Sequence, residues 1–330
     1  MKFGPVSVSE AEGAILAHSL GLPDGRLRKG RVLTPDDLKR ITGAGLTEVT
    51  VARLEAEDLH EDVAADRLAK AIVPDPERAG LRLGQASTGR VNIYATAPGV
   101  IEVLADRIDA LNALHPMITV ATVPAWQRAA INGMIATVKI ISYGVPKAAL
   151  EAACLAGQSA LRLKPAQHKT ARLIQTTIDP EAKGEKGQAV TKERLDRLGV
   201  SLAPECQVRH DVPALAEALR ATQEELVLIL TGSATSDPYD VAPEALRQAG
   251  GEVIHFGMPV DPGNLLFFGR LNDRPVIGLP GCARSPAMNG ADWVLERLIC
   301  DVKLAPSDIA RMGVGGLLKE IPMRGRLREA

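Results

Sequence analysis

The sequence predicts an α/β protein, with a C-terminal three-layer α/β/α doubly wound domain preceded by an N-terminal α+β region. Three observations support this prediction. The chain has 330 residues, which suits two domains of about 150 residues each. After residue 170, short apolar runs alternate with amphipathic helical segments, as in strand–helix–strand units. Before residue 150, predicted strands and helices are mixed without that alternation.

In the N-terminal region, residues 8–20 are predicted to form a short helix with Ser9 as its cap. A second helix follows Thr34 as N-cap and Pro35 at the first helical position, and it ends near Gly45. The remaining predicted elements of this region are strands at 48–51, 90–94 and 135–141 and helices at 58–72 and 108–114. Prolines and a glycine between 73 and 80 predict a linker between two small subdomains, which together span residues 1–165.

The predicted C-terminal domain spans residues 166–302, and residues 303–330 are predicted to form a partly ordered tail. Residues 226–230 are five apolar residues in a row, which is typical of a strand buried on both faces of a parallel sheet. Asp211, Asp240 and Ser285 are predicted helix N-caps. The remaining predicted strands are 173–178, 205–209, 252–256 and 275–279, and the predicted helices are 190–198, 211–221, 240–250 and 285–299.

The composition of the chain argues against several classes of function. The formal net charge of −1 gives no basic footprint for nucleic acid, and a 3% aromatic content leaves few side chains for stacking on bases. The four cysteines form no CxxC pair, so neither a zinc site nor a disulfide framework is expected. The first residues lack a signal peptide's apolar run, and no apolar stretch is long enough to cross a membrane. We therefore expect a cytoplasmic protein without nucleic-acid or membrane partners.

Two loops at predicted strand ends are candidates for ligand binding, because ligands of open α/β sheets lie beyond the carboxyl ends of the strands. Residues 231–240 carry a glycine, several hydroxyls and Asp240. Residues 278–286 are rich in glycine and proline and contain Arg284, a bidentate phosphate donor, before a predicted helix N-terminus. The turn at 261–265 could line the same cleft. Each segment could also be an ordinary turn, with Asp240 acting only as a cap.

Other catalytic motifs are absent from the sequence. The histidines have no HExxH spacing, and neither a GxSxG elbow nor a GxxxxGK[ST] loop occurs. Cys282 lies in a glycine turn where a thiolate could be stabilised, but no histidine is beside it in the sequence. The two loops therefore remain the main candidates.

Residues 171–299 resemble the molybdopterin-binding domain of molybdenum cofactor biosynthesis proteins. The segment 231–240 is similar to the family's Gly-Gly-x-Ser…Asp loop, and Gly-Leu-Pro-Gly-Cys-Ala-Arg-Ser at 278–285 is similar to its Gly-Leu-Pro-Gly-Asn-Pro-x-Ser motif. Asp211 matches an acidic residue that precedes a helix in the family. Segments 11–17 and 29–51 resemble parts of the multi-domain molybdopterin molybdenumtransferases.

The resemblance implies binding of molybdopterin, or its adenylylated form, with Mg²⁺ and molybdate as possible further ligands. It assigns Asp240 and Asp211 to catalysis and to Mg²⁺ or molybdate, since hard cations prefer carboxylate oxygens. It also implies a homo-oligomer and a molybdenum-cofactor nucleotidyltransferase or a molybdoenzyme as partner. The residues it assigns to cofactor binding are Gly232, Ser233, Thr235, Ser236, Pro262, Gly263, Asn264, Pro280, Gly281, Arg284 and Ser285.

The sequence departs from the family at two motifs. Where the family has Gly-Asp-Glu-Leu, residues 175–180 read Gln-Thr-Thr-Ile-Asp-Pro, so that Glu181 or Glu185 would have to substitute. An Asp-Gly-aromatic-Ala motif is missing, and residues 88–92 are its candidate replacement. Three hypotheses follow: a molybdenumtransferase-like enzyme, a non-catalytic molybdopterin carrier or sensor, and a nucleotide-processing hydrolase like the competence-damage amidases that share this domain.

Overall fold

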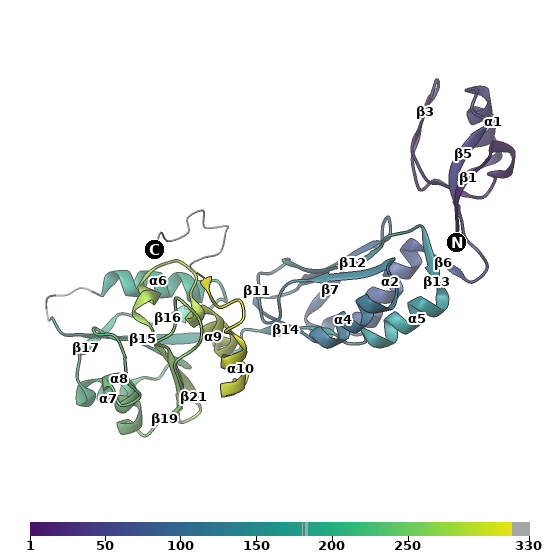
Figure 1. The fold of residues 1–330 in the computed structure, drawn as a ribbon. Coiled ribbons are helices and arrows are strands. Elements are labelled where there is room, and N and C mark those ends of the chain that lie inside the picture. The colour runs from purple at the N-terminus through teal and green to yellow at the C-terminus, as the bar shows by residue number, and fades with distance from the viewer. Residues whose placement is uncertain (180, 182–183, 319–330) are drawn as a thin grey trace, which may run out of the picture. The chain divides into compact units, whose positions relative to one another are not determined.

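The computed structural model describes residues 1–179, 181 and 184–318 (Figure 1). They divide into two compact units. The first unit comprises Met1–Thr96, Ile101–Ala125 and Ile131–Leu163. The second comprises Ala97–Val100, Trp126–Ala130 and the chain from Lys164 onward. The elements up to Leu163 therefore lie mostly in the first unit, apart from two short segments that belong to the second.

The first 165 residues form small antiparallel sheets and short helices, most of which belong to the first unit (Figure 1). Strands β1, β5 and β2 pair in one sheet, and β10, β12, β8 and β7 pair in another that α2 covers. The element bounds are β1 Lys2–Ser7, β2 Ile15–Leu16, β3 Leu20–Leu22, β4 Gly25–Leu27, α1 Pro35–Gly43, β5 Glu48–Arg53, β6 Asp58–His60, α2 Glu61–Ile72, α3 Pro76–Ala79, β7 Leu81–Leu83, β8 Arg90–Ala95, β9 Gly99–Val103, α4 Ala105–Leu114, β10 Ile118–Thr122, β11 Arg128–Ala129, β12 Met134–Ile140, β13 Gly144–Pro146, α5 Lys147–Ala156 and β14 Leu161–Pro165.

Two predictions for the first unit have opposite outcomes. Helix α1 begins as predicted, with Thr34 as N-cap in a capping box and proline at the first helical position. The helix predicted over residues 8–20 is wrong, because only Val8–Glu10 forms a 3-10 turn before β2 and β3. Val8, Ala11 and Ala14 are buried at a helix-like spacing, but Gly13 has φ +72° and turns the chain away from a helix.

The second unit is built on one seven-stranded sheet. Its strand order is β16-β15-β18-β21-β20-β19, with β17 paired to β15 as well. The element bounds are β15 Thr170–Thr177, α6 Glu185–Asp196, β16 Ser201–Leu202, β17 Cys206–Arg209, α7 Val212–Ala221, β18 Leu226–Leu230, α8 Val241–Gln248, β19 Glu252–Phe256, β20 Phe267–Leu271, β21 Arg274–Leu279, α9 Gly290–Ile299 and α10 Pro306–Arg311.

The sheet is mixed and mostly parallel. Strands β15, β16, β17, β18 and β21 run parallel, while β20 is antiparallel to both β19 and β21. Strand β20 was not predicted from the sequence, although Asn272 and Asp273 form the kind of two-residue turn that joins hairpin strands. Asn272 has φ +55°, which a hairpin turn of this kind requires.

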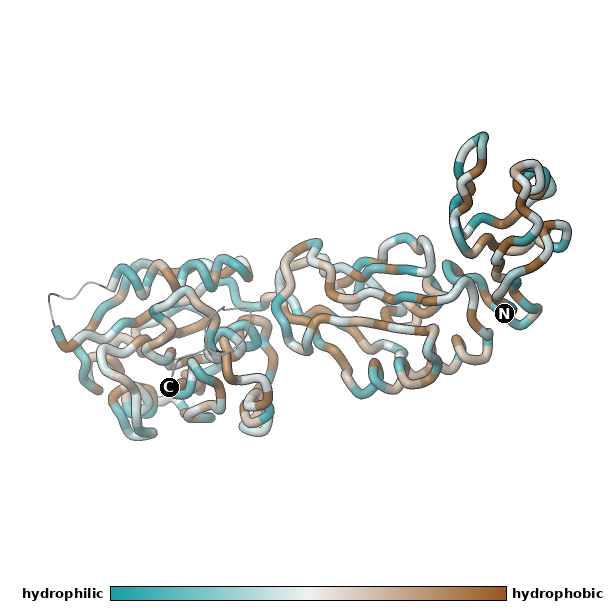
Figure 2. The backbone as a smooth tube through the Cα atoms, turned by 45° about the horizontal axis from the view of Figure 1, so that its top comes forward, coloured by the Kyte–Doolittle hydropathy of each residue, from teal (hydrophilic) through white to brown (hydrophobic). Residues whose placement is uncertain are grey.

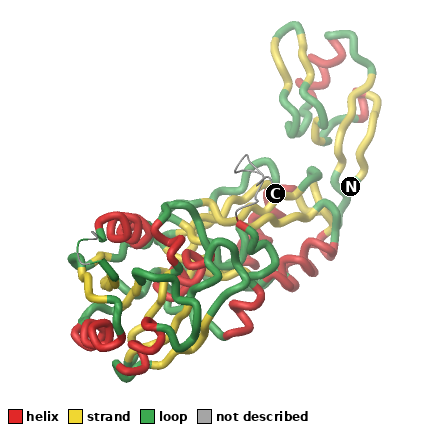
Figure 3. Tube along the Cα trace, turned by 60° about the vertical axis from the view of Figure 1, so that its left-hand side comes forward, coloured by secondary structure: helices red, strands yellow, loops and turns green. Residues whose placement is uncertain are grey.

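Two hydrophobic clusters flank this sheet and make the unit three-layered (Figure 3). Leu228 and Leu230 pack with residues of α6, α9 and α10. Val227 and Ile229 belong to the cluster that includes residues of α7 and α8. All five residues of β18 are buried, as predicted, because the strand lies between β15 and β21 and is covered on both faces. In Figure 2 brown, hydrophobic positions occur along the strands of this unit, and α6 is largely teal.

Two helix starts differ from the prediction. Helix α6 begins at Glu185 rather than 190, because its first turn contains Gly187 and charged residues that hide the helical period. Helix α9 begins at Gly290 with Asn289 as N-cap, not at Ser285. Residues Gly281–Arg284 form a 3-10 turn, and Asp292 completes a capping box with Asn289.

The segment predicted as a tail begins with ordered structure. Helix α10 lies within residues 303–318, and Ile309, Met312 and Leu318 are buried in the cluster shared with α6 and α9. Residues 319–330, which were predicted as part of the same tail, lie outside the described residues. In the part of the chain that the structure describes, no helix combines the length and apolar content needed to cross a membrane.

Candidate functional site

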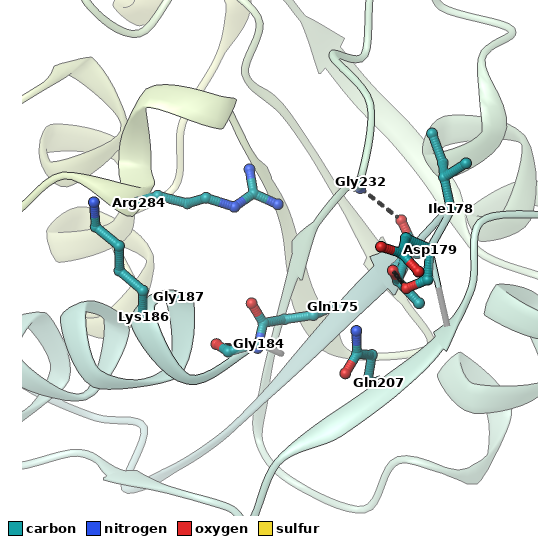
Figure 4. Close-up of a pocket in the computed structure, with 11 residues that line it drawn as sticks. Gln175, Ile178, Asp179, Gly184, Lys186, Gly187, Gln207, Gly232 and Arg284 are labelled. Carbon is teal, nitrogen blue, oxygen red and sulfur yellow. Dashed lines mark hydrogen bonds between the residues drawn. The ribbon is translucent and has the colours of Figure 1, made fainter. Parts of the chain in front are cut away.

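A cavity of about 450 Å³ lies in the second unit where β15 and β18 end (Figure 4). Its walls come from the end of β15, the start of α6, strand β17 and the loops after β18 and β21. The described residues that line it are Gln175, Thr176, Thr177, Ile178, Asp179, Gly184, Lys186, Gly187, Gln207, Gly232 and Arg284.

The topology explains why the cavity is there. The chain leaves β15 through α6 toward β16 and β17 on one side, while β18 pairs with β15 on the other side. Loops that follow β15 and β18 therefore diverge, and a crevice opens between them at the carboxyl ends of the parallel strands. A cavity of this size is within the range that holds small organic ligands.

The start of α6 forms one wall, and its glycines keep that wall close to β15. Gln175 donates from Nε2 to the carbonyl of Gly184 at 2.9 Å. A Cβ on Gly187 would lie 2.3 Å from Gln175 Oε1 and 2.9 Å from Leu230 Cδ2. Gly184 is the N-cap residue and supplies no side-chain cap. The first amides of a helix have no acceptor inside it, so this wall favours an anion.

A buried hydroxyl fixes the opposite wall. Thr176 is 3% exposed, and its Oγ1 accepts the amide of Gly232 at 2.9 Å. The same oxygen lies 2.7 Å from Nδ1 of His210. A Cβ on Gly232 would be 2.9 Å from the carbonyl of Thr176, so glycine is needed for this close approach. In Figure 4 a dashed line at Gly232 marks this hydrogen bond.

Two cationic residues line the cavity. Arg284 donates from Nη2 to the carbonyl of Thr231 at 2.8 Å, and Figure 4 shows its guanidinium directed over the space above Gln175. Burial lowers the pKa of the Arg284 guanidinium from its ordinary value, but an arginine in a protein stays positively charged. Lys186, in the first turn of α6, also lines the cavity and is exposed. Together with the helix start they make this part of the cavity electropositive.

The side of the cavity opposite Arg284 is different in character. Asp179 and Gln207 line it with polar oxygens, and Ile178 adds an apolar side chain that is 68% exposed. Asp179 is the one carboxylate among the described lining residues. It occupies the stretch that replaces the family's Gly-Asp-Glu-Leu motif, for which Glu181 or Glu185 was proposed as a substitute. Those two glutamates are not among the lining residues.

Of the residues predicted from the sequence to bind the cofactor, the structure brings Gly232 and Arg284 to this cavity. The rest of the loop after β18 is not part of its described lining. Ser233 and Ser236 are exposed, while Thr235 is buried with its Oγ1 3.3 Å from that of Thr231. The end of the loop is fastened to α8, because Arg247 lies over the Tyr239 ring at 5.1 Å.

Asp240 and Asp211 both act as helix caps. Asp240 accepts the amides of Val241 at 2.7 Å and Ser236 at 3.0 Å. Asp211 accepts the amide of Ala214 at 2.9 Å at the start of α7. Neither lines the cavity, and no cluster of three or more His, Cys, Asp or Glu side chains in the described ranges could hold a metal ion. Their assignment to Mg²⁺ or molybdate therefore stays a prediction.

The turn that contains Pro262, Gly263 and Asn264 packs against the start of α9. Gly290 donates its amide to the carbonyl of Pro262 at 2.8 Å. Gly263 has φ +142°, and a Cβ on it would lie 2.8 Å from the nitrogen of Gly290. Pro280, Gly281 and Ser285 surround Arg284 in the loop after β21, with Pro280 buried and the other two exposed. Ser285 is not a helix cap, and the helix whose start lines the cavity is α6.

Nine of the eleven lining residues were not predicted from the sequence to bind a ligand: Gln175, Thr176, Thr177, Ile178, Asp179, Gly184, Lys186, Gly187 and Gln207. The available signal was the pair Gly184 and Gly187 just after a buried strand, which resembles other glycine turns that lead into ligand-binding helices. Gln175 and Thr176 could be recognised as polar residues that directly follow the apolar pair Leu173 and Ile174. No signal identified Gln207, because an exposed glutamine on an edge strand is common.

Comparisons with protein families match two segments of the chain. Residues 176–299 match a family described as a probable molybdopterin binding domain. Residues 5–53 match a domain of unknown function. A relative from Methanocaldococcus jannaschii, named "Putative molybdopterin biosynthesis protein", is 33% identical over 75 residues, which is 22% of this chain and 19% of that protein. The matched segment thus spans about a fifth of that relative.

Among solved structures, a molybdopterin biosynthesis MoeA protein from Pyrococcus horikosii aligns with 91% of this chain and 75% of its own, at 14% identity and a TM-score of 0.33. Molybdenum cofactor biosynthesis protein B aligns with 42% of this chain and 97% of its own, at 14% identity and a TM-score of 0.31. These scores are below 0.5, so we take nothing about function from them. The family match is independent of them, and it identifies residues 176–299 as a domain of the probable molybdopterin-binding type.

Proposed function

We propose that this chain binds molybdopterin, or its adenylylated form, in the cavity between the start of α6 and the loops after β18 and β21. The observation that carries the proposal is an electropositive cavity inside a molybdopterin-binding domain: Arg284, Lys186 and the uncapped start of α6 line the same space. A phosphate group is the part of molybdopterin that these groups suit, since a helix start and an arginine both favour anions.

The remainder of the lining suits the heterocycle. A pterin carries N–H groups on its pyrimidine edge, and the oxygens of Asp179 and Gln207 can accept hydrogen bonds from them. Ile178 offers an apolar surface for a flat ring. The cavity thus has one cationic part for a phosphate and one acceptor-rich part for a donor-rich ring. Binding and presentation of the pterin, the role of a carrier, need nothing beyond these groups.

Molybdate insertion is the second candidate function, and Asp179 is the observation in its favour. An insertion enzyme would turn over adenylylated molybdopterin and molybdate and release AMP. Mg²⁺, a hard cation, needs oxygen ligands, and Asp179 supplies one carboxylate at the cavity. Asp240 would be a further candidate only if it left its position as the cap of α8.

Binding is tested by native mass spectrometry of the purified chain and by calorimetric titration with molybdopterin. Arg284→Ala should weaken binding at least tenfold, because a charge-assisted hydrogen bond is worth about 1.5–3 kcal/mol. Arg270→Ala is the matched control. Arg270 lies on β20 in the same unit, forms an ion pair with Glu252 in which Nη2 and Oε2 are 3.0 Å apart, and is not among the residues that line the cavity. Equal affinity in both variants would refute the proposed site.

Insertion is tested by AMP release from adenylylated molybdopterin in the presence of molybdate. Asp179→Asn should lower this rate by about 10²-fold if the carboxylate acts in the reaction, while molybdopterin binding stays intact. Asp240→Asn keeps a cap, so a large loss of rate in that variant would assign Asp240 to the reaction. If the wild-type chain releases no AMP, molybdate insertion is excluded and the carrier function is the one that remains.

A further inference from the structure

Arg194 is a buried arginine that the binding site does not itself use. It lies on α6, is 6% exposed, and donates a hydrogen bond from Nε to Oδ1 of Asp292. Its other nitrogens reach three carbonyls of the loop after β21. Nη1 donates to Ala283 at 2.7 Å, and Nη2 donates to Ser285 at 2.8 Å and to Ala287 at 3.3 Å.

The cost of burying this charge indicates that the arrangement is specific. An unpaired guanidinium in a protein interior is strongly unfavourable, and pairing repays that cost only when the remaining donors are also satisfied. Here Asp292 supplies the opposite charge, and three carbonyls accept hydrogen bonds from three of the four remaining N–H groups. Asp292 also accepts the amide of Asn289 at 2.8 Å in the capping box of α9. One ion pair therefore joins α6, the loop and α9.

The position of the three carbonyls is the informative detail. Ala283 and Ser285 are the two neighbours of Arg284 in the chain, so Arg194 holds the backbone on both sides of the cavity arginine. Backbone bonds inside the loop, from Ala283 to Pro280 and from Ser285 to Cys282, shape its turns. Arg194 adds a connection from those turns to α6, which lies against the same 3-10 turn.

We propose that Arg194 is a positioning residue: it fixes Arg284 relative to the start of α6, so that both can contact one phosphate group. The identity of the bound ligand in this inference rests on the proposed function, whereas the contact between Arg194 and the loop does not. Arg284 in turn donates to Thr231, so that two arginines link all three walls of the electropositive part of the cavity. A bidentate site of this kind depends on distance between its donors.

The test is Arg194→Lys, with Arg297→Lys as matched control. Lysine keeps a positive charge beside Asp292 but cannot reach three carbonyls in fixed directions. Arg297 is 9% exposed in α9 and donates to the carbonyl of Trp293 at 2.7 Å, so its replacement also disturbs a buried arginine. In Arg194→Lys, hydrogen exchange of amides 283–288 should accelerate at least tenfold and molybdopterin affinity should fall at least tenfold. In Arg297→Lys neither should change more than about twofold.

A double-mutant cycle separates positioning from general destabilisation. If Arg194 acts through Arg284, then Arg194→Lys should weaken molybdopterin binding in the wild-type background and have little further effect in Arg284→Ala. Equal losses in both backgrounds would overturn the inference. Should Arg194→Lys fail to fold, the pair Arg194→Met with Asp292→Leu removes both charges together and should give the same exchange and affinity results.

The two proposals fail in different ways. If the wild-type chain does not bind molybdopterin, the proposed function falls, and loop exchange in Arg194→Lys still decides whether Arg194 holds residues 283–287. If the wild-type chain binds and Arg194→Lys binds equally well with unchanged loop exchange, the proposed function stands and the role of Arg194 is overturned.

Discussion

Helices α6 and α8 follow neighbouring strands of one sheet, but they begin in different ways. The N-cap of α8 is Asp240, whose carboxylate accepts the amide of Val241 in the helix and that of Ser236 in the loop before it. The N-cap of α6 is Gly184, which supplies no side-chain cap, and the first turn of α6 lines the cavity. The difference teaches that a carboxylate at a helix start and an anion site at a helix start exclude one another, because both need the same amides.

The same contrast separates the two faces of the sheet. On the α6 side, a buried ion pair ties the helix to the loop that carries Arg284. On the α8 side, the loop after β18 is fastened to the helix by Asp240 and by Arg247 stacked on Tyr239. We infer that the α8 side supports the fold while the α6 side presents groups to a ligand. The predictions below test that division.

The largest effect is expected in β18, which supports both faces. Leu228→Ala and Ile229→Ala should each lower the free energy of unfolding by about 2–5 kcal/mol, because both side chains are fully buried. Leu228 faces α6 and Ile229 faces α8. Only Leu228→Ala should therefore also weaken molybdopterin binding, as measured by titration at a temperature where both variants are folded. Equal affinities would contradict the division between faces.

Giving α6 the kind of start that α8 has should abolish much of the binding. Gly184→Asp places a carboxylate at the helix start, and we expect molybdopterin affinity to fall about 10- to 10²-fold through charge repulsion and loss of amide donors. Gly184→Ala is the control for size, since a Cβ there would already lie 2.3 Å from Gln175 Nε2 and 2.4 Å from Glu205 Oε1. The carboxylate variant should bind more weakly than the alanine variant; the reverse order would argue against an anion at α6.

Removing the cap of α8 should have the complementary result. Asp240→Ala leaves two amides without their acceptor and should lower the free energy of unfolding by about 1 kcal/mol. Asp240→Asn should barely change it, since asparagine caps nearly as well. Denaturant titration measures the stability, and molybdopterin affinity should stay within twofold in both variants. A larger loss of affinity would mean that Asp240 contributes to ligand binding and not only to the stability of the fold.

How far the sequence predicts this protein depends on how local the signal is. The caps Thr34, Asp211 and Asp240 and the buried strand β18 were predicted correctly, because short runs of residues determine them. Strand β20 and the start of α6 were missed. Glycines and charged residues conceal the helical hydrophobic period at the start of α6. Strand β20 is defined by its pairing with β21 and not by a local sequence pattern.

The candidate site was predicted in part for the same reason. Gly232 and Arg284 stand in loops with unusual composition, so their types could be recognised. Gln175 and Thr176 reach the cavity only because β15 ends at the point where the sheet order reverses. Arg194 is a polar residue in a helix by sequence, and its role depends on carbonyls about 90 residues away in the chain, as the separations of 89 and 91 show.

The smallest effect concerns the cap of α7 and its dependence on pH. The hydrogen bond from Arg209 and the amide of Ala214 hold the pKa of Asp211 below its ordinary value. A carboxyl whose pKa is lower in the folded state stabilises the fold above its unfolded pKa of about 3.9, and that contribution is lost as the pH falls through the lowered value. Asp211→Asn still caps the helix but cannot titrate. The stability of the wild type relative to Asp211→Asn should therefore be constant from pH 5 to 7 and decline below about pH 4. Denaturant titrations of both proteins over this range measure it, and parallel curves down to pH 3 would mean that Arg209 does not stabilise the Asp211 carboxylate in solution.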